Sequence, residues 1–515
     1  MSFLLTVGLS AQQASRTEPV TGMRDNATGY HALVGARVVT APGQTMDNAT
    51  IVIRNGLIVS VAQNQAAPAG ARVWDVAGHT VYPGFIDAHA DLGMDQVPEG
   101  GDVGPTHWNP QVRAWFSTTD NLQDDDDRRQ GLRSQGFGTA LVVPKQGIFR
   151  GTASVVNLGD SGVRERILRP DVAQSIGFQR SFELGGRYPN SAMGTIALMR
   201  QTFMDADWYE RAWQAYEASG RSFLPPETSA ALEALERAAR GEQPVIFETN
   251  SEEEYLRSHT LAEEFGLTAW YRGSGQEYRI IDVLRGSDEP LFVPLDFPDA
   301  PDVDDPESAL DASLAELRHW YLAPTSPGQL ADAGIDFAIT TDGLTSVGDF
   351  LPNLRTAVAR GLSPDDALAA LTTTPARWLG IEGTHGTIAE GKVANLVVAE
   401  GDLFTQEADI RDVWVHGVAY DVTRPAQIDP RGTWMIASDD PWGFRAQLTL
   451  EGTLNRLQGY IDVAPGPNVE EGARIDIASA SVVAETGRLE VRFSGEDLGF
   501  QGTALLAGSI SGADF

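Results

Sequence analysis

The sequence predicts an α/β protein built on a (β/α)8 (TIM) barrel, with a small β-sandwich contributed by both flanks and an antiparallel β module at the C-terminal end. Three observations carry this prediction. Short β-branched runs fill residues 29–80 and return at 384–425. Between them, at 81–383, short apolar runs alternate with amphipathic stretches of helical length, which is typical of parallel α/β folds. Residues 432–515 then alternate apolar and polar side chains, as strands of an antiparallel sheet do.

The two flanking segments share one pattern. Residues 36–40 and 50–54 are rich in Val, Ile and Thr, which favour strands. Asn55-Gly56 follows the second run and is a hairpin signal, because both residues accept positive φ angles. Similar runs occur at 386–398 and 413–417. Because the two segments enclose the central one, we expect them to form one composite domain.

The central segment contains candidate buried strands and well-delimited helices. Ser229 is a candidate N-cap for a helix that Gly241 ends, and Ser363-Pro364 opens another. Roughly 300 residues of this alternation suit a (β/α)8 barrel with insertions. The candidate strands are 81–86, 140–143, 245–247, 291–293 and 337–339.

Composition narrows the range of functions. The chain has 515 residues, so we expect two or three domains. It has no cysteine, which excludes disulfides, thiolate metal sites and cysteine nucleophiles. A net charge of −33 opposes binding to nucleic acid, because phosphates would be repelled. No run of 18 apolar residues occurs, so no transmembrane segment is expected.

The two ends of the chain carry further expectations. Within residues 1–28, an apolar stretch at 3–9 precedes Ser10 and Ala11, which resembles the end of a secretory signal peptide without its basic part. This favours a periplasmic or secreted protein, with a cytoplasmic one as the alternative. At the other end, 432–515 stops just after a strand-like run. We therefore expect the natural chain to continue.

Several separated motifs carry a resemblance to a known family. Residues 80–89, Thr-Val-Tyr-Pro-Gly-Phe-Ile-Asp-Ala-His, resemble the first-strand signature of the amidohydrolase superfamily. The hairpin at 55–59, the helix at 371–380 and the segment 383–398 match the flanking parts of that family. Motifs in the right order are more specific than any single one. The chain is identified on this basis as similar to exported, imidazolonepropionase-like amidohydrolases over residues 30–421.

This resemblance implies a site with one or two metal ions at the C-terminal mouth of the barrel. In the family, a His-x-His pair ends strand one, and a carboxylated lysine or a glutamate lies on strand four. Histidines end strands five and six, and an aspartate ends strand eight. The metal acidifies a water molecule that attacks an amide carbonyl, and the aspartate takes the proton.

The matching positions of this chain depart from that pattern. Strand one offers His89 and Asp91, strand five Glu248, strand six Arg272 and strand eight Asp342. The candidate metal ligands are therefore His89, Asp91, Glu248 and Asp342, with Asp342 also the candidate catalytic base. An arginine is always protonated and cannot bind a metal, so Arg272 is a candidate to balance the carboxylates or to bind substrate.

Lysine and loop residues complete the candidate site. The chain has two lysines, Lys145 on an earlier strand and Lys392 in the flanking β segment. Neither lies on strand four, so a metal pair bridged by a carboxylated lysine is not expected. His107 lies in the loop after strand one and is a second candidate for substrate binding. The alternative is a surface loop.

Each candidate has a structural alternative. His89 and Asp91 could be polar residues that end a strand and are hydrogen-bonded at the mouth, and Asp342 could belong to an Asp-Gly turn. If the site does bind a metal, its oxygen-rich ligands suit a hard cation such as Mg or Mn, and Zn stays open as a third candidate.

Two functions follow from these alternatives. In the first, the chain hydrolyses carbon–nitrogen bonds of a small amide or peptide-like molecule at an atypical site for Zn, Mn or Mg. In the second, it is a catalytically inactive barrel without metal that binds a ligand or supports a partner. Such a partner could be a second amidohydrolase domain or another copy of the chain. An ion pair between Arg272 and Glu248 or Asp342 would favour the second function.

Overall fold

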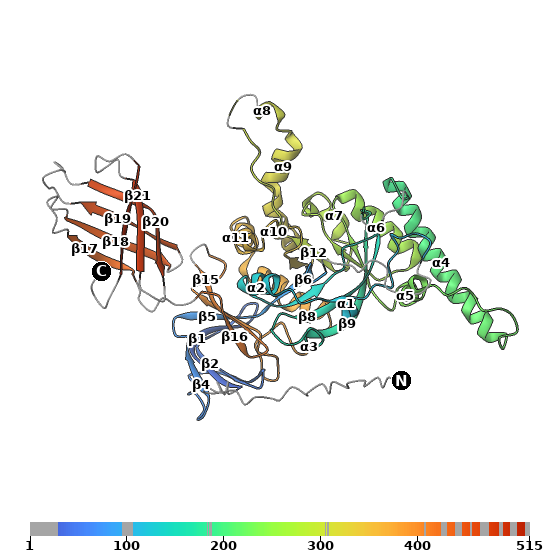
Figure 1. The fold of residues 1–515 in the computed structure, drawn as a ribbon, viewed down its shortest axis with the longest axis horizontal. Coiled ribbons are helices and arrows are strands. Elements are labelled where there is room, and N and C mark those ends of the chain that lie inside the picture. Colours follow the sequence, from blue (N-terminus) through green and yellow to red (C-terminus); the bar gives the residue numbers. More distant parts are fainter. Residues whose placement is uncertain are drawn as a thin grey trace, which may run out of the picture.

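The computed structural model contains three β-sheets, with the helices gathered around the second sheet (Figure 1). The expected signal-peptide remnant at 1–28 lies outside the described residues. The structure describes residues 29–94, 107–182, 184, 188–303, 305, 308–405, 408–423, 430–437, 445–453, 456–463, 473–483, 488–494 and 502–509.

The first sheet joins strands from both flanks of the chain. Its order is β16-β15-β14-β5-β1-β2-β3, with β4 paired to β1, and Figure 1 shows the blue N-terminal strands beside the orange β15 and β16. β14 pairs antiparallel with β5, which links the two flanks directly. The strands are β1 (Tyr30–Ala41), β2 (Gln44–Arg54), β3 (Leu57–Gln63), β4 (Arg72–Asp75), β5 (His79–Pro83), β14 (Leu396–Glu400), β15 (Asp409–Val415) and β16 (Val418–Asp421).

The flanking strands form one continuous hydrogen-bonded sheet, and its packing as a sandwich stays a prediction. β1 pairs with β4 through residues 31–34 and with β5 through residues 37–38. Gly35 lies between these stretches at a φ of 82°, a conformation that glycine adopts without strain. The change of partner at Gly35 therefore lets a single strand serve both parts of the sheet. Ile51, Val398 and Trp414 are buried in its core.

The second, central sheet has the order β13-β12-β11-β10-β9-β8-β7-β6. β6 and β7 are parallel, and so are β9 to β13, but β8 runs antiparallel to both of its neighbours. The uniform strand–helix alternation predicted for 81–383 is therefore wrong between β7 and β9. The strands are β6 (Phe85–Ala90), β7 (Phe137–Val142), β8 (Phe149–Asn157), β9 (Ile167–Gly177), β10 (Val245–Glu248), β11 (Ala269–Arg272), β12 (Leu291–Pro294) and β13 (Ala338–Thr340).

The reason for the antiparallel strand is local. Only short loops and one four-residue helix separate β7, β8 and β9, and a parallel connection needs a crossover of a dozen or more residues. Side chains at the C-terminal end of β13 also link the two edges of the central sheet. The Thr340 hydroxyl donates to the His89 carbonyl at 2.5 Å, and the Thr341 hydroxyl donates to Asp87 Oδ2 at 2.5 Å. The C-terminal ends of β6 and β13 therefore lie side by side.

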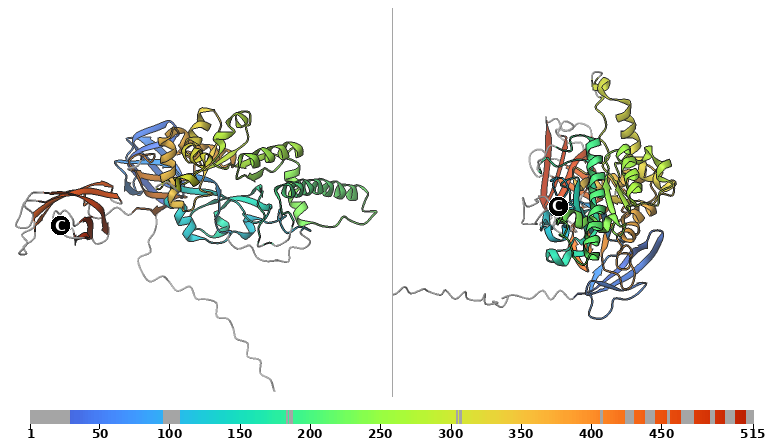
Figure 2. Two further views of the ribbon diagram at one scale, coloured as in Figure 1. Left: turned by 90° about the horizontal axis from the view of Figure 1, so that it is seen from above. Right: turned by 90° about the vertical axis from the view of Figure 1, so that its right-hand side faces the viewer.

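The helices begin where the sequence offers caps. The Ser229 side chain accepts from Leu232 N at the start of α5 (Ala230–Ala239), and Ser363 accepts from Asp366 N at the start of α12 (Pro364–Leu371). The views in Figure 2 show α4 (Ala192–Ala218) and the segment of α8 (Ser308–Asp311) and α9 (Leu314–Leu322) extending away from the central sheet. No helix in the described part of the chain is both long and apolar enough to span a membrane.

The α-helices lie mainly between strands of the central sheet and after β13, together with three short 3-10 helices. The α-helices are α1 (Thr118–Asn121), α2 (Asp126–Ser134), α3 (Val163–Arg166), α4 (Ala192–Ala218), α5 (Ala230–Ala239), α6 (Glu252–Phe265), α7 (Ile281–Leu284), α8 (Ser308–Asp311), α9 (Leu314–Leu322), α10 (Ser326–Asp332), α11 (Phe350–Ala359), α12 (Pro364–Leu371) and α13 (Thr373–Trp378). The 3-10 helices are η1 (Glu277–Arg279), η2 (Ala323–Thr325) and η3 (Val347–Asp349).

The third sheet confirms the predicted antiparallel module. Its six strands pair in chain order, each antiparallel to the next. Alternate side chains such as Leu448, Ile461 and Val491 are buried together. The strands are β17 (Gly432–Ala437), β18 (Arg445–Thr453), β19 (Arg456–Val463), β20 (Ala473–Val483), β21 (Arg488–Ser494) and β22 (Thr503–Ser509).

Candidate functional site

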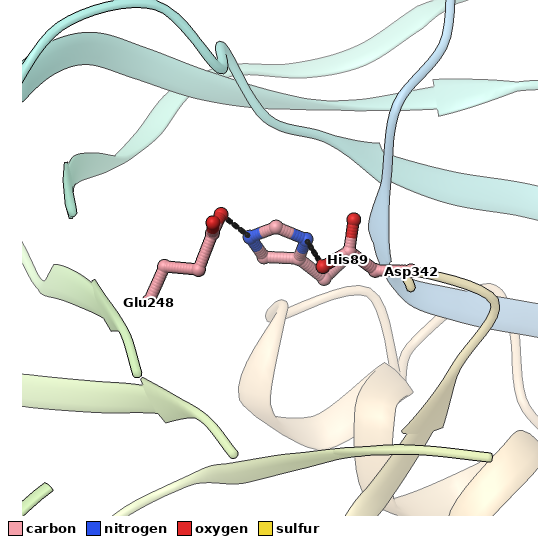
Figure 3. Close-up of side chains that lie close together, drawn as sticks. All are labelled: His89, Glu248 and Asp342. Carbon is pink, nitrogen blue, oxygen red and sulfur yellow. Dashed lines mark ion pairs between the residues drawn. The ribbon is translucent and has the colours of Figure 1, made fainter. Parts of the chain in front are cut away.

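The C-terminal ends of the central strands bring four of the predicted site residues together. His89 lies on β6, Glu248 ends β10, Arg272 ends β11, and Asp342 follows β13 by two residues. Parallel strands present their C-terminal ends at one edge of a sheet, so these side chains converge. Figure 3 shows the His89 ring lying between Glu248 and Asp342.

His89 is the centre of this group. Its Nε2 lies 3.7 Å from Glu248 Oε2, and its Nδ1 lies 3.6 Å from Asp342 Oδ2. The ring is fully buried, and neither nitrogen has a hydrogen-bond partner among the residues that the structure describes. One donor atom from each of the three residues lies within 4.8 Å of the others, a spacing that could hold a metal ion.

Lys145 also belongs to this site, although the sequence analysis placed it elsewhere. Its Nζ lies 2.6 Å from Asp342 Oδ1 and 3.0 Å from Glu248 Oε2. The ammonium group therefore bridges the two carboxylates. Lys145 follows the C-terminal end of β7 by three residues, and that position relative to a parallel strand is the signal that could have identified it.

Two arginines complete the charge balance. Arg272 Nε lies 2.6 Å from Asp342 Oδ2, and Arg150 Nη1 lies 2.5 Å from Glu248 Oε2. Arg150 lies near the start of the antiparallel β8, where its guanidinium occupies space that a Cβ at Gly177 would overlap. Each carboxylate therefore contacts two cations, and Lys145 is shared between them.

The charges fix the protonation states of the cluster. Burial alone would raise the pKa of Asp342, but His89, Lys145 and Arg272 outweigh burial and lower it to about 2. Burial likewise opposes ionisation of Glu248, yet Arg150 and Lys145 hold its pKa well below the usual range. Burial and the neighbouring Lys145 lower the pKa of His89 to about 3. Near neutral pH, two carboxylates therefore flank a neutral imidazole.

Residues under the cluster hold His89 and Asp342 in place. The buried Asp87 accepts from the His89 backbone N–H at 3.1 Å and from the Thr341 hydroxyl. Thr340 Oγ1 accepts from the Asp342 backbone N–H at 3.0 Å. Burial raises the pKa of Asp87 despite these hydrogen bonds.

Two predicted residues lie outside the group formed by His89, Glu248 and Asp342. Asp91 pairs with Arg128 at 3.3 Å, and both side chains are about two-fifths exposed. Asp91 still lines a cavity of about 230 Å³ together with Asp342, Arg128 and Thr341. His107 accepts from the Asn109 backbone N–H at 3.1 Å and lies beside Trp108.

The residues as arranged do not fit a divalent metal ion. Zinc would lie about 2.0–2.2 Å from carboxylate oxygens and from a histidine nitrogen. The Lys145 ammonium already contacts one oxygen of Asp342 and one of Glu248. Arg272 contacts the second oxygen of Asp342, and Arg150 also contacts the Glu248 oxygen that Lys145 reaches. Like charges at this distance would repel an entering cation.

Comparisons with known proteins agree with this architecture. A model of the Amidohydrolase family matches residues 326–423. The chain is 24% identical over 388 residues to the imidazolonepropionase of Chromobacterium violaceum, covering 70% of this chain and 86% of that protein. It is 23% identical over 405 residues to amidohydrolase tasK of Hapsidospora irregularis, covering 72% of this chain. The match spans only 39% of the length of tasK.

A solved structure shows the same fold. An amidohydrolase from Thermotoga maritima superposes with a TM-score of 0.62 and 24% identity, covering 75% of this chain and 98% of that one. The central and flanking sheets are therefore those of a TIM-barrel protein with an attached β-rich domain. The matched family segment and the relatives described above agree with this fold. Together they show that the chain belongs to the amidohydrolase superfamily.

Proposed function

We propose that this chain is a non-hydrolytic amidohydrolase barrel, in which side-chain cations replace the metal and the mouth binds a small molecule without cleaving it. One observation carries the proposal. Lys145 bridges Glu248 and Asp342 while Arg272 pairs with Asp342 at 2.6 Å. These contacts occupy the carboxylates that a metal hydrolase would use.

The chemistry of the cluster supports this proposal. A general base works best when its pKa lies near the working pH, because it must both lose and accept a proton. The pKa of Asp342 is about 2 and that of His89 about 3. Both groups are therefore weak bases at neutral pH, and for Asp342 the neighbouring Lys145 and Arg272 are part of the reason.

The ligand class is proposed from the cavity and the relatives. The cavity beside Asp342 holds about 230 Å³ and offers carboxylate, guanidinium and hydroxyl groups from Asp91, Arg128 and Thr341. This volume is below the roughly 300–1,000 Å³ of sites for drug-sized ligands, so it suits a small molecule. Relatives of this chain are named amidohydrolase and imidazolonepropionase, and a small cyclic or peptide-like amide is the corresponding ligand.

A second candidate function is hydrolysis of a carbon–nitrogen bond at a site for Zn, Mn or Mg. His89 favours it, because its buried ring, whose nitrogens have no hydrogen-bond partner among the described residues, lies within 4.8 Å of donor atoms on Glu248 and Asp342. This function would require Lys145 to leave the position that it occupies in the structure.

Binding and turnover assays separate the two functions. Purified protein is incubated with cyclic amides and dipeptides in the presence of Zn, Mn or Mg, and cleavage is followed by mass spectrometry. Binding is measured on the same compounds by thermal shift. We expect at least one compound to bind and none to be cleaved faster than in the D342A variant. Metal-dependent turnover that D342A abolishes would establish the hydrolase instead.

A further inference from the structure

We infer that Lys145 takes the place of a divalent cation, and that His89, Glu248 and Asp342 form a latent metal site that Lys145 keeps closed. This inference rests on the proposed function, because it assumes that the native mouth holds no metal. It goes further by assigning the closure to one side chain and by stating what its removal would uncover.

The position of Lys145 is the first step of the argument. Its Nζ contacts Asp342 Oδ1 at 2.6 Å and Glu248 Oε2 at 3.0 Å. These two residues and His89 are the described residues whose donor atoms gather within 4.8 Å. The ammonium group thus contacts two of the three side chains that could ligate an ion.

The state of His89 is the second step. Its ring is fully buried, and within the described ranges both nitrogens lack a hydrogen-bond partner. Leaving buried polar atoms unpaired destabilises a fold, so such atoms call for an explanation. Lys145 directs its bonds to the carboxylates and leaves the histidine unpaired, whereas a metal ion would accept a ring nitrogen as a ligand.

The remaining donors are the third step. Without Lys145, Asp342 Oδ1 loses the one cation that contacts it in the described part of the chain, while Arg272 still contacts Oδ2 and Arg150 still contacts Glu248. His89, Asp342 and Glu248 would then offer three ligands. Three protein ligands with an open fourth position are typical of accessible zinc sites. The Lys145 side chain is 26% exposed, so its truncation opens the mouth rather than the apolar core.

The experiment uses the two lysines of the chain as test and matched control. K145M removes the ammonium group and keeps an unbranched side chain, and K392M removes the other lysine, which donates to the Glu382 and His385 carbonyls. Each protein is dialysed against Zn and its metal content is measured by plasma mass spectrometry. We expect about one ion per chain in K145M, and no stoichiometric metal in the wild type or K392M. Adding D342N to K145M should abolish the uptake.

The outcomes separate this inference from the proposed function. Folded K145M that takes up no more zinc than the wild type would overturn the inference and leave the proposed function standing. Stoichiometric zinc in the wild type would contradict both. K145S, whose small hydroxyl leaves room for water between the carboxylates, provides the same test if K145M does not fold. Thermal unfolding with and without zinc gives a second readout, since zinc should stabilise only the variants that lack Lys145.

Discussion

The flanking sheet and the mouth of the barrel relate differently to the amidohydrolase superfamily. The family model matches residues 326–423, which include β14 to β16 of the flanking sheet. Of the charged cluster, only Asp342 lies in that range. His89, Lys145, Glu248 and Arg272 all lie outside it. The family model therefore matches strands of the flanking sheet, but it leaves out most of the charged residues at the mouth of the barrel.

Packing and chemistry impose different demands on these regions. In the flanking sheet, Ile51, Val398 and Trp414 are buried among apolar neighbours, where shape and volume decide stability. At the mouth, buried carboxylates require compensating charge, so a lost cation must be replaced by another. The comparison teaches that the residues that pack a fold and the residues that form its site answer to different demands, which is why fold alone does not establish function.

The substitution with the largest expected effect on stability tests the packing of the flanking sheet. Ile51→Ala should lower the free energy of unfolding by about 2–5 kcal/mol, because it leaves a cavity in a fully buried position. Chemical denaturation measures this loss. Metal content should stay as in the wild type, and an I51A variant that gained metal would link two regions that we treat as independent.

Arg272→Ala should have the next largest effect. It removes the guanidinium from the buried Asp342, and breaking a buried ion pair costs about 3–5 kcal/mol. Because Lys145 still contacts Asp342, we expect about 2–3 kcal/mol. R285A is the matched control, since the exposed Arg285–Asp282 pair should contribute less than about 1 kcal/mol. Equal losses in both variants would show that the mouth cluster is not electrostatically coupled.

The pH dependence of the free energy of unfolding tests one buried histidine from each region, His89 at the mouth and His385 beside the flanking sheet. Burial lowers the pKa of His89 to about 3 and that of His385 to about 4, from an ordinary value of 6.5. Between these values and 6.5, the unfolded chain binds more protons than the folded chain, so stability falls as the pH decreases. Each histidine should contribute a slope of up to about 1.4 kcal/mol per pH unit. Denaturation at pH 4 to 7 should show a shallower slope in H89Q and in H385Q, and an unchanged slope would contradict the assignment.

The smallest effect concerns the edge of the site. Asp91→Ala should change the free energy of unfolding by less than about 1 kcal/mol, because the Asp91–Arg128 pair is partly exposed. Ligand binding in the cavity should weaken, since Asp91 lines it beside Asp342. If D91A destabilised the protein as much as R272A, Asp91 would belong to the central cluster.

Much of this site could be predicted from the sequence. The resemblance to the amidohydrolase superfamily implied that His89, Glu248, Arg272 and Asp342 lie at the C-terminal ends of barrel strands, and the structure brings them together. The expected balance between an arginine and the carboxylates is found in the Arg272–Asp342 pair. The metal-binding role of these residues remains a prediction.

Arg150 was missed because the sequence pattern did not reveal the direction of β8, whereas Lys145 was missed although it follows the C-terminal end of β7. A uniformly parallel barrel would place Arg150, near the start of its strand, at the opposite end from the mouth. Because β8 is antiparallel, its start lies level with the C-terminal ends of β9 and β10. Lys145 lies in the turn that leads into this strand. Strand direction depends on loop length and pairing partners, which periodicity alone does not reveal.

The most direct test of the central claim is anomalous diffraction from wild-type crystals soaked in zinc. We predict no anomalous peak between His89, Glu248 and Asp342, and electron density for the Lys145 ammonium bridging the two carboxylates. A peak about 2.0–2.2 Å from a His89 nitrogen and both carboxylates, with Lys145 displaced, would contradict the account and restore a metal-dependent site.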